Sequence, residues 1–266
     1  MKIGIVGCAG RMGRMLVAEV ILTDGAELIG GTESPGSDFI GQDVAGLAGM
    51  DEPGLEVGDD AQALIAASDV IIDFTAPAAT VAHAAMAAKT KTGLVVGTTG
   101  LDSDDMAALS QAAESSVVVQ AGNMSVGVNL LVGLTEQVSN ILGDDYDIEI
   151  AEMHHKHKVD APSGTALMLG DAAAKGRGVN LDDVSDRGRD GHTGARKAGD
   201  IGFVSLRGGD VVGDHSIIFS GPGERIELTH KAGDRKLFAG GAVRAALWTK
   251  GRAAGLYTMR DVLGLA

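Results

Sequence analysis

The chain has one cysteine, Cys8, only five prolines, and aromatic residues that make up 3% of its 266 residues. A lone cysteine cannot form a disulfide within the chain, which excludes a disulfide-stabilised secreted domain and favours a reducing compartment. No apolar run approaches the roughly 18 residues of a membrane-spanning helix, and the apolar start MKIGIVG is too short for a signal peptide. We therefore expect a soluble, cytoplasmic protein with no membrane partner.

Positive charge is also scarce. Lys and Arg number 22 against 36 Asp and Glu, which gives a formal net charge of −14 at pH 7. A surface of this sign repels polyanions, so we expect no nucleic-acid partner. Hydrophobic residues make up 45% of the chain and charged residues 22%, which is the composition of a folded protein rather than a disordered one.

From Lys2 to Val119 the chain alternates short apolar runs with alanine-rich segments of helical character. Runs such as Asp69–Phe74 and Gly93–Val96 lack polar alternation, which is typical of parallel strands covered on both faces. Such strands are joined by right-handed helical crossovers. The pattern predicts an α/β fold with a Rossmann-type, doubly wound parallel sheet.

After Asn123 the pattern changes, and we predict a second, α+β domain with a mixed or antiparallel sheet. Helices are expected over Val126–Leu142, from Ser163 to about Lys175 and over Asp234–Arg252, and strands over Asp147–Met153, Ile201–Arg207, Asp214–Ser220 and Glu224–His230. The segment Gly176–Asp200 follows neither period and is predicted to be a long surface loop. Val262–Leu265 is expected to be a short apolar tail.

Three glycines follow the first predicted strand. Gly7, Gly10 and Gly13 form a G-x-x-G-x-x-G pattern that opens a helix. The first glycine permits a tight turn, the second lets a pyrophosphate approach the backbone, and the third allows close helix-to-strand packing. Arg11 and Arg14 add positive charge beside the helix N-terminus, where an anion binds. The alternative is an ordinary glycine-rich turn of an α/β sheet.

Polar residues also follow other predicted strands. Glu33 ends the second strand about two dozen residues after the glycines, where a carboxylate can accept hydrogen bonds from a ribose. Gly97–Gly100 and Gly122–Ser125 follow two further strands, and ligands of open α/β sheets gather at these strand ends. Each feature alone is also compatible with a solvated carboxylate or a plain turn. Together they predict a site for NADH, NADPH or both.

The segment Glu152–Ala166, EMHHKHKVDAPSGTA, carries three histidines within four residues. Metal binding is less favoured because no second cluster with ligand spacing accompanies them, so we predict no metal. Acyl transfer through Ser163 would need a nucleophile elbow or a Ser-x-x-Lys pattern, and neither is present. The third interpretation is a site for a dianionic substrate, with cationic Lys and His side chains near Ser163, Gly164 and Thr165 at a helix N-terminus. We assign structural roles to the four histidines outside the segment, which are His83, His192, His215 and His230.

Several motifs together resemble those of the 4-hydroxy-tetrahydrodipicolinate reductase family, also called the dihydrodipicolinate reductase family. The resemblance runs along the whole chain and is carried by Val6–Arg14, Asp73–Thr75, Gly97–Gly100, Asn123–Asn129 and, above all, Glu152–Ala166. It implies a dinucleotide-binding domain of residues 1–125 completed by residues 235–266. It also implies a substrate-binding domain of residues 126–234 whose sheet assembles a homotetramer.

The resemblance also implies roles for individual residues. His154 matches a proton donor or acceptor and Lys158 a proton donor, whereas His155, Gly164 and Thr165 match substrate contacts, to which our interpretation of the cap adds Ser163. The residues that match nucleotide contacts are Gly7, Cys8, Ala9, Gly10, Arg11, Met12, Glu33, Gly97, Thr98, Thr99, Ala121, Gly122, Asn123 and Met124. Ser34 and Ala76 stand where some relatives have an Arg, which leaves the choice between NADH and NADPH open.

For the reaction, the resemblance implies hydride transfer from NADH or NADPH to ring carbon C4 of a small heterocyclic dicarboxylate, with loss of water, in diaminopimelate and lysine biosynthesis. Two alternatives stay open. One is a dehydrogenase of another small dicarboxylate, which would share the glycine turn but not the HHKHKVDAPSGTA run. The other is a nucleotide sensor without catalytic activity.

Overall fold

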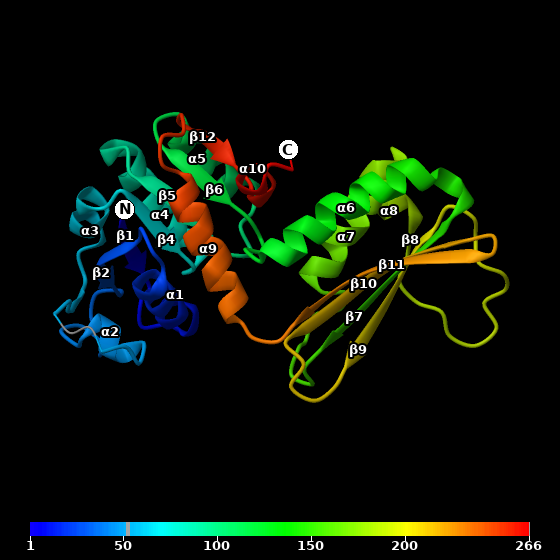
Figure 1. Cartoon of the computed structure of the whole chain (residues 1–266), viewed down its shortest axis with the longest axis horizontal. Coiled ribbons are helices and arrows are strands. Elements are labelled where there is room, and N and C mark those ends of the chain that lie inside the picture. Colours follow the sequence, from blue (N-terminus) through cyan, green and yellow to red (C-terminus); the bar gives the residue numbers. More distant parts are fainter. Residues whose placement is uncertain (52–53, 266) are drawn as a thin grey trace. The chain divides into compact units, whose positions relative to one another are not determined.

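The computed structural model describes residues 1–51 and 54–265 (Figure 1). It divides into two compact units. Unit 1 contains Met1–Val126 and the residues from Lys236 onward, and unit 2 is Gly127–Arg235. Ala266, which the predicted dinucleotide-binding domain includes, lies outside the described residues.

Unit 1 is built on a seven-stranded sheet in the order β12-β6-β5-β4-β1-β2-β3, and all its strand pairs are parallel. The strands are β1 (Lys2–Val6), β2 (Glu27–Thr32), β3 (Val57–Gly58), β4 (Val70–Asp73), β5 (Gly93–Val96), β6 (Val117–Gln120) and β12 (Gly255–Tyr257). Every residue of β4 and β5 is buried, as their apolar runs predict. The predicted Rossmann-type sheet is therefore confirmed.

Helices cover both faces of this sheet (Figure 1). They are α1 (Arg11–Leu22), α2 (Val44–Leu47), α3 (Ala61–Ala67), α4 (Pro77–Thr90), α5 (Ser103–Ala113), α9 (Lys236–Trp248) and α10 (Met259–Leu263). One apolar core holds α1 and α9 against the sheet, and a second holds α3, α4 and α5. The last helix corrects a prediction, because the expected apolar tail begins as α10, with a capping box between Thr258 and Asp261.

Unit 2 has a five-stranded mixed sheet in the order β11-β10-β7-β9-β8. Its elements are α6 (Val126–Leu142), the 3₁₀ turn η1 (Gly143–Asp145), β7 (Asp147–His154), α7 (Gly164–Arg177), α8 (Leu181–Val184), β8 (Ser185–Asp186), β9 (Ile201–Arg207), β10 (Gly213–Gly221) and β11 (Glu224–Ala232). The pairs β11-β10 and β10-β7 are antiparallel, whereas β7-β9 and β9-β8 are parallel. The predicted mixed sheet is confirmed.

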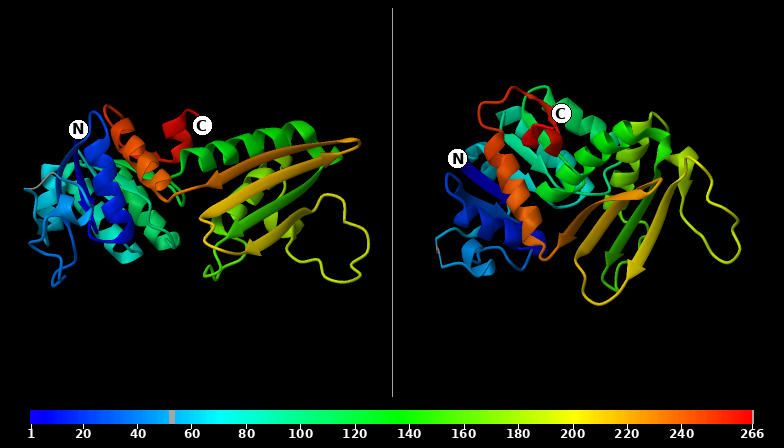
Figure 2. Two further views of the ribbon diagram at one scale, coloured as in Figure 1. Left: turned by 60° about the horizontal axis from the view of Figure 1, so that its bottom comes forward. Right: turned by 45° about the vertical axis from the view of Figure 1, so that its right-hand side comes forward.

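One face of the unit 2 sheet carries α6 and α7 (Figure 2). Alternate residues of β10, including Ile217 and Phe219, are fully buried beneath these helices. The two helices approach closely at Gly176, where an added Cβ would lie 2.8 Å from the Ser139 Cβ. On the opposite face Val204 and Leu206 are about half exposed, at 50% and 51%.

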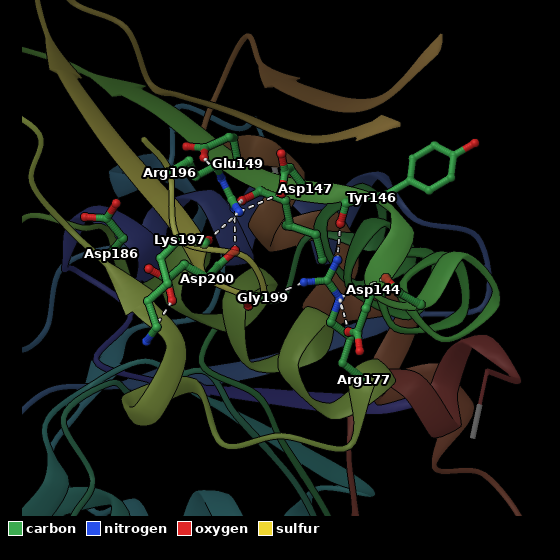
Figure 3. Close-up of polar contacts among 12 residues, drawn as sticks. Asp144, Tyr146, Asp147, Glu149, Arg177, Asp186, Arg196, Lys197, Gly199 and Asp200 are labelled. Atoms are coloured by element: carbon green, nitrogen blue, oxygen red, sulfur yellow. Dashed lines mark hydrogen bonds and ion pairs between the residues drawn. The ribbon is translucent and has the colours of Figure 1, made fainter. Parts of the chain in front are cut away.

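The long loop predicted over Gly176–Asp200 is only partly correct, because α7 extends to Arg177 and α8 and β8 follow it. Residues 187–200 do form an irregular segment, which ion pairs attach to β7 (Figure 3). Glu149 Oε1 accepts from Arg189 Nη2 at 2.8 Å and from Arg196 Nε at 2.9 Å. Arg196 Nη1 also lies 2.8 Å from Asp147 Oδ1. The segment is thus anchored at two arginines that share one carboxylate.

We expect Glu149→Gln to loosen this segment without unfolding the protein. The pairs are partly exposed, so each contributes no more than about 1 kcal/mol, but the variant weakens both anchors at once. Limited trypsin digestion should then cut after Arg189 or Arg196 several-fold faster, with little change in melting temperature. Asp190→Asn removes a charge from the same segment and is the control. Equal cleavage rates in the two variants would show that Glu149 does not anchor the segment.

Candidate active site

The glycine turn has the local geometry that its spacing predicts. Gly7 has a φ of +68°, and its N–H donates to the Thr32 carbonyl at 2.8 Å. Gly10 is the N-cap of α1. An added Cβ at Gly13 would lie 2.7 Å from the Cys8 Cα and closer still to the Gly7 carbonyl oxygen, so α1 touches the turn at this point. The first N–H groups of α1 have no helical acceptor and can receive an anion.

Glu33 lies next to this turn. Its Oε1 accepts a hydrogen bond of 2.8 Å from the Ala9 N–H, which places the carboxylate beside the turn at the end of β2. Arg14 stabilises the turn itself. Its Nε donates to the Ala9 carbonyl at 2.8 Å, and its guanidinium lies over the Phe39 ring. Of the two arginines that were predicted to provide charge here, Arg11 is the exposed one.

The thiol of Cys8 is buried against Gly31. Burial and the nearby Glu33 carboxylate raise the pKa of Cys8 to about 11. A thiol with so high a pKa is protonated at neutral pH and is a poor nucleophile. The whole residue is 2% exposed and its N–H donates to the Thr32 carbonyl at 3.2 Å, so Cys8 presents little surface to a ligand at this turn.

The ends of β4 and β5 share a buried hydrogen-bond network. Asp73 Oδ1 accepts from the Thr75 N–H at 2.8 Å and from the Thr98 hydroxyl at 3.4 Å, and its Oδ2 lies 2.8 Å from His83 Nδ1. The Thr98 hydroxyl also lies 2.8 Å from that of Thr80. Thr98 is thus held from within the fold, and His83 has the structural position that we predicted.

The segment after β6 forms a polar turn. Asn123 Oδ1 accepts from the Ser125 N–H at 2.8 Å, and an added Cβ at Gly122 would meet no atom within 4 Å. Met124 differs from expectation as a nucleotide contact, because the whole residue is 1% exposed and packs in the core shared with α9. The Met124 carbonyl also lies against Gly241 of α9, so Met124 presents almost no surface to a ligand.

These strand ends lie around a topological switch point. From β1 the chain proceeds to β2 and β3 on one side, and from β4 to β5 and β6 on the other. Ligands of open α/β sheets bind outside the carboxyl ends of the strands at such a point. All fourteen predicted cofactor residues follow β1, β2, β5 or β6 or lie in the first turn of α1. The residues present therefore fit a dinucleotide.

In unit 2, Glu152 is the centre of the polar cluster. Its side chain is 1% exposed, and Arg207 binds both of its oxygens at 2.8 Å. Its Oε2 lies 2.6 Å from His154 Nδ1, and its Oε1 accepts from the Ser163 N–H at 3.3 Å. Burial opposes ionisation, but hydrogen bonds from Arg207, Ser205 and His154 outweigh it and lower the pKa of Glu152 to about 2. Glu152 is therefore ionised at neutral pH.

His154 has one ring nitrogen committed to this carboxylate. Because an ionised carboxylate only accepts hydrogen bonds, His154 Nδ1 carries a proton. His154 Nε2 is then the nitrogen left for proton exchange. It lies beside Gly213, where an added Cβ would be 3.0 Å away. The ring of His215 packs edge-on against that of His154, with 5.0 Å between the ring centroids.

Ser163 caps α7 as predicted. Its hydroxyl accepts from the Ala166 N–H at 3.2 Å and lies 2.9 Å from His215 Nε2. An added Cβ at Gly164 would meet no atom within 4 Å, so the space above the first turn of α7 is open. A helix of 14 residues with open space at its N-terminus can receive a carboxylate.

Lys158 follows in the same segment and forms an ion pair. Its Nζ lies 2.9 and 2.8 Å from the two carboxylate oxygens of Asp160. His155 Nδ1 is buried and has no hydrogen-bond partner among the described residues. Burial, and then the positive charge of Arg235, lower the pKa of His155. Of the cationic side chains predicted here, His155 is thus largely neutral at pH 7, and it offers a hydrogen bond rather than a charge.

The sequence interpretation missed three members of this cluster. Glu152 was included in the motif but given no role, Arg207 was not considered, and His215 was treated as an unrelated structural histidine. A signal for His215 did exist, because strand periodicity places it on the same face as Ile217 and Phe219. A histidine on the core face of a strand needs polar neighbours, and here these are Ser163 and His154.

His215 should make the protein sensitive to acid. Burial and the neighbouring His154 lower the pKa of His215 from 6.5 to about 4. The neutral ring therefore stabilises the fold fully above about pH 6.5, and this contribution is lost as the pH falls towards 4. At about 1.4 kcal/mol per pKa unit, the loss approaches roughly 3 kcal/mol.

Urea unfolding at several pH values checks this expectation. His215→Asn should be less stable than the parent at neutral pH, and its free energy of unfolding should fall less steeply in acid. His192→Asn replaces an exposed histidine and is the control. Parallel curves for the parent and His215→Asn would contradict the assignment.

Two further properties apply to residues 1–51 and 54–265. No group of three or more His, Cys, Asp or Glu side chains is placed to hold a metal ion. No helix in this part of the chain is long and apolar enough to cross a membrane.

The parallel sheet, the glycine turn and the acidic residue beside it are those of Rossmann-type, nicotinamide-dependent oxidoreductases. Comparison of the chain with models of protein families identifies one family within this class. The model described as "Dihydrodipicolinate reductase, N-terminus" matches residues 1–124, and that described as "Dihydrodipicolinate reductase, C-terminus" matches residues 127–263. The chain belongs to the dihydrodipicolinate reductase family.

Individual relatives agree with this assignment. The chain is 57% identical to a 4-hydroxy-tetrahydrodipicolinate reductase of Rhodopseudomonas palustris, with 100% of this chain and 98% of the relative covered. It is also 57% identical to the reductase of the same name from Ruegeria pomeroyi, with 98% and 97% covered. Among solved structures, the dipicolinate-bound dihydrodipicolinate reductase of Paenisporosarcina sp. TG-14 shares the fold, with a TM-score of 0.78, 24% identity and 98% of each chain covered.

Proposed function

We propose that the protein reduces 4-hydroxy-tetrahydrodipicolinate to tetrahydrodipicolinate, with loss of water, in diaminopimelate and lysine biosynthesis. The observation that carries this proposal is the EMHHKHKVDAPSGTA segment, which folds into one cluster of His154, Lys158 and the start of α7 in a chain that matches the family along both units. A bound NADH or NADPH supplies the hydride for ring carbon C4.

Unit 1 would hold the dinucleotide. The N–H groups at the start of α1 would receive the pyrophosphate, and Glu33 would accept hydrogen bonds from the adenosine ribose. Thr98, Thr99 and the turn after β6 would surround the nicotinamide end. Glu33 and Ser34 suit a ribose without a 2′-phosphate, whereas the exposed Arg11 can pair with one, so we expect both coenzymes to serve.

Unit 2 would bind the substrate and provide the proton. The open first turn of α7, from Ser163 to Thr165, and the buried unpaired nitrogen of His155 support recognition of the carboxylates. Lys158 would exchange Asp160 for a substrate carboxylate. His154 Nε2 and Lys158 Nζ are the atoms that we propose to hold the proton delivered to the ring.

The assay that tests this proposal follows the absorbance of the reduced coenzyme with freshly prepared substrate, once with NADH and once with NADPH. We expect turnover with both coenzymes and none with other small dicarboxylates. Turnover of another dicarboxylate instead would identify a different dehydrogenase. Coenzyme binding without turnover of any substrate would indicate a nucleotide sensor.

We also propose that residues 126–234 form the assembly domain of a cytoplasmic homotetramer. The half-exposed Val204 and Leu206 on the helix-free face of the unit 2 sheet support this proposal, because exposed apolar patches mark contact surfaces. Light scattering of the purified protein should give the mass of four chains. A monomer mass at micromolar concentration would contradict it.

A further inference from the structure

We propose that Glu152 and Arg207 are positioning residues that hold the His154 ring so that Nε2 is the atom that exchanges the proton. The proposal rests on the function given above, in which His154 takes part in proton transfer. Neither Glu152 nor Arg207 touches the substrate in this arrangement. Both act through His154 and through the start of α7.

Both carboxylate oxygens of Glu152 accept hydrogen bonds from within the fold. Oε2 receives His154 Nδ1 at 2.6 Å and Arg207 Nη1 at 2.8 Å. Oε1 receives Arg207 Nη2 at 2.8 Å and the Ser163 N–H at 3.3 Å. A carboxylate bound on both oxygens by one guanidinium cannot rotate without breaking two charge-assisted hydrogen bonds. The orientation of the His154 ring is therefore determined by a group that is itself fixed.

Arg207 is committed to this task rather than to ligand binding. Beyond the two bonds to Glu152, its Nη2 donates to the Asp160 carbonyl at 2.7 Å and its Nη1 to the Leu206 carbonyl at 2.6 Å. Its positive charge offsets a carboxylate that is 1% exposed, and a buried charge without a partner is strongly destabilising. The bond to Asp160 also fixes the backbone next to Lys158.

The strands explain why this arrangement is rigid. Glu152 and His154 are two residues apart on β7 and face the same side of the sheet. Arg207 pairs with His154 across β7 and β9, and His215 pairs with Glu152 across β7 and β10. Functional groups on neighbouring strands are held more precisely than groups on loops. The ionised Glu152, with its pKa of about 2, can accept from His154 but has no proton to give.

Nuclear magnetic resonance tests the proposal without any turnover. In the full-length protein with ¹⁵N-labelled histidine, His154 should appear as the tautomer protonated at Nδ1 at neutral pH, with His154→Gln used for assignment. In Glu152→Gln the amide can present its nitrogen to the ring, so we expect the Nε2–H tautomer or a mixture. An unchanged His154 tautomer in folded Glu152→Gln would overturn the proposal.

Kinetics provide a second readout. We expect Glu152→Gln to lower kcat about 10- to 100-fold, the loss typical when the carboxylate partner of a metal-ligating histidine is removed, while the KM for the substrate changes less than about 3-fold. Glu149→Gln, the same substitution on the same strand, should leave kcat unchanged. An equal loss in both variants would overturn the proposal.

Two further variants keep the test decisive if Glu152→Gln folds poorly. Arg207→Lys retains the charge but not the fork, and it should show an intermediate loss of kcat. The double variant Glu152→Gln with Arg207→Met removes both charges and avoids a buried unpaired one. It should lose kcat as Glu152→Gln does, and wild-type kcat in this double variant would refute the proposal. If the parent protein lacks reductase activity but its His154 tautomer depends on Glu152, the proposed function fails while the positioning stands.

Discussion

Gly10→Ala should strongly weaken dinucleotide binding in a protein that still folds, whereas Gly13→Ala should destabilise the fold itself. The two glycines are three residues apart, yet their surroundings differ. An added Cβ at Gly10 lies 3.3 Å from the Gly7 carbonyl oxygen, which a small shift relieves, but it would occupy the path of the pyrophosphate that we propose to bind here. At Gly13 the Cβ would overlap backbone atoms of Gly7 and Cys8, which cannot move without displacing α1 from β1.

Fluorescence titration with NADH and thermal unfolding separate the two effects. For Gly10→Ala we expect the Kd for NADH to rise at least about 100-fold, which is about 2.7 kcal/mol, with a nearly unchanged melting temperature. For Gly13→Ala we expect a loss of about 3 kcal/mol of stability, which corresponds to a melting temperature lower by about 10 °C. Gly240→Ala, where the added Cβ meets only the flexible Glu19 side chain, is the control. Wild-type NADH affinity in Gly10→Ala would mean that the pyrophosphate binds elsewhere.

Elements with strong local signals could be predicted from the sequence. The helix Val126–Leu142 has the predicted bounds, because a long apolar period runs through it, and a helix does follow the glycine turn, over Arg11–Leu22. The strands β3 and β12 were missed because two or three residues are too few to show a period. They join the sheet because neighbouring strands offer unpaired backbone groups, which is a tertiary effect.

The cluster around Glu152 shows a second limit of prediction from a single sequence. The cap at Ser163 depends on residues that are close in sequence, and it could be predicted from the Pro-Ser-Gly order alone. The fork from Arg207 spans 55 residues and the contact from His215 to Ser163 spans 52. Both depend on how β9 and β10 pair with β7, and single-sequence patterns do not specify strand register over such distances. Glu152 lies in the motif itself, but the contacts of Arg207 with Glu152 and of His215 with Ser163 were therefore beyond the reach of motif analysis.

Lys158→Ala should lower kcat/KM by a factor of about 10³ or more, since a positioned proton donor alone contributes about 10²- to 10⁴-fold and the same ammonium would bind a substrate carboxylate. Lys158→Arg separates the two roles. The guanidinium introduced by Lys158→Arg keeps the positive charge, but a guanidinium does not give up a proton near neutral pH. We therefore expect a KM close to that of the parent and a kcat nearly as low as that of Lys158→Ala.

Asp160→Asn tests whether the Lys158 ammonium leaves Asp160 to pair with a substrate carboxylate. Asp160 Oδ2 lies 2.8 Å from Lys158 Nζ, so the carboxylate would compete with an incoming dianion for the ammonium. Removing its charge should lower the KM for the substrate, while kcat stays within about 3-fold because the backbone bond from Arg207 to residue 160 does not depend on the side chain. Steady-state kinetics of these variants beside His154→Gln distinguish the roles. Turnover near that of the parent in both His154→Gln and Lys158→Ala would require the proton to come from another group.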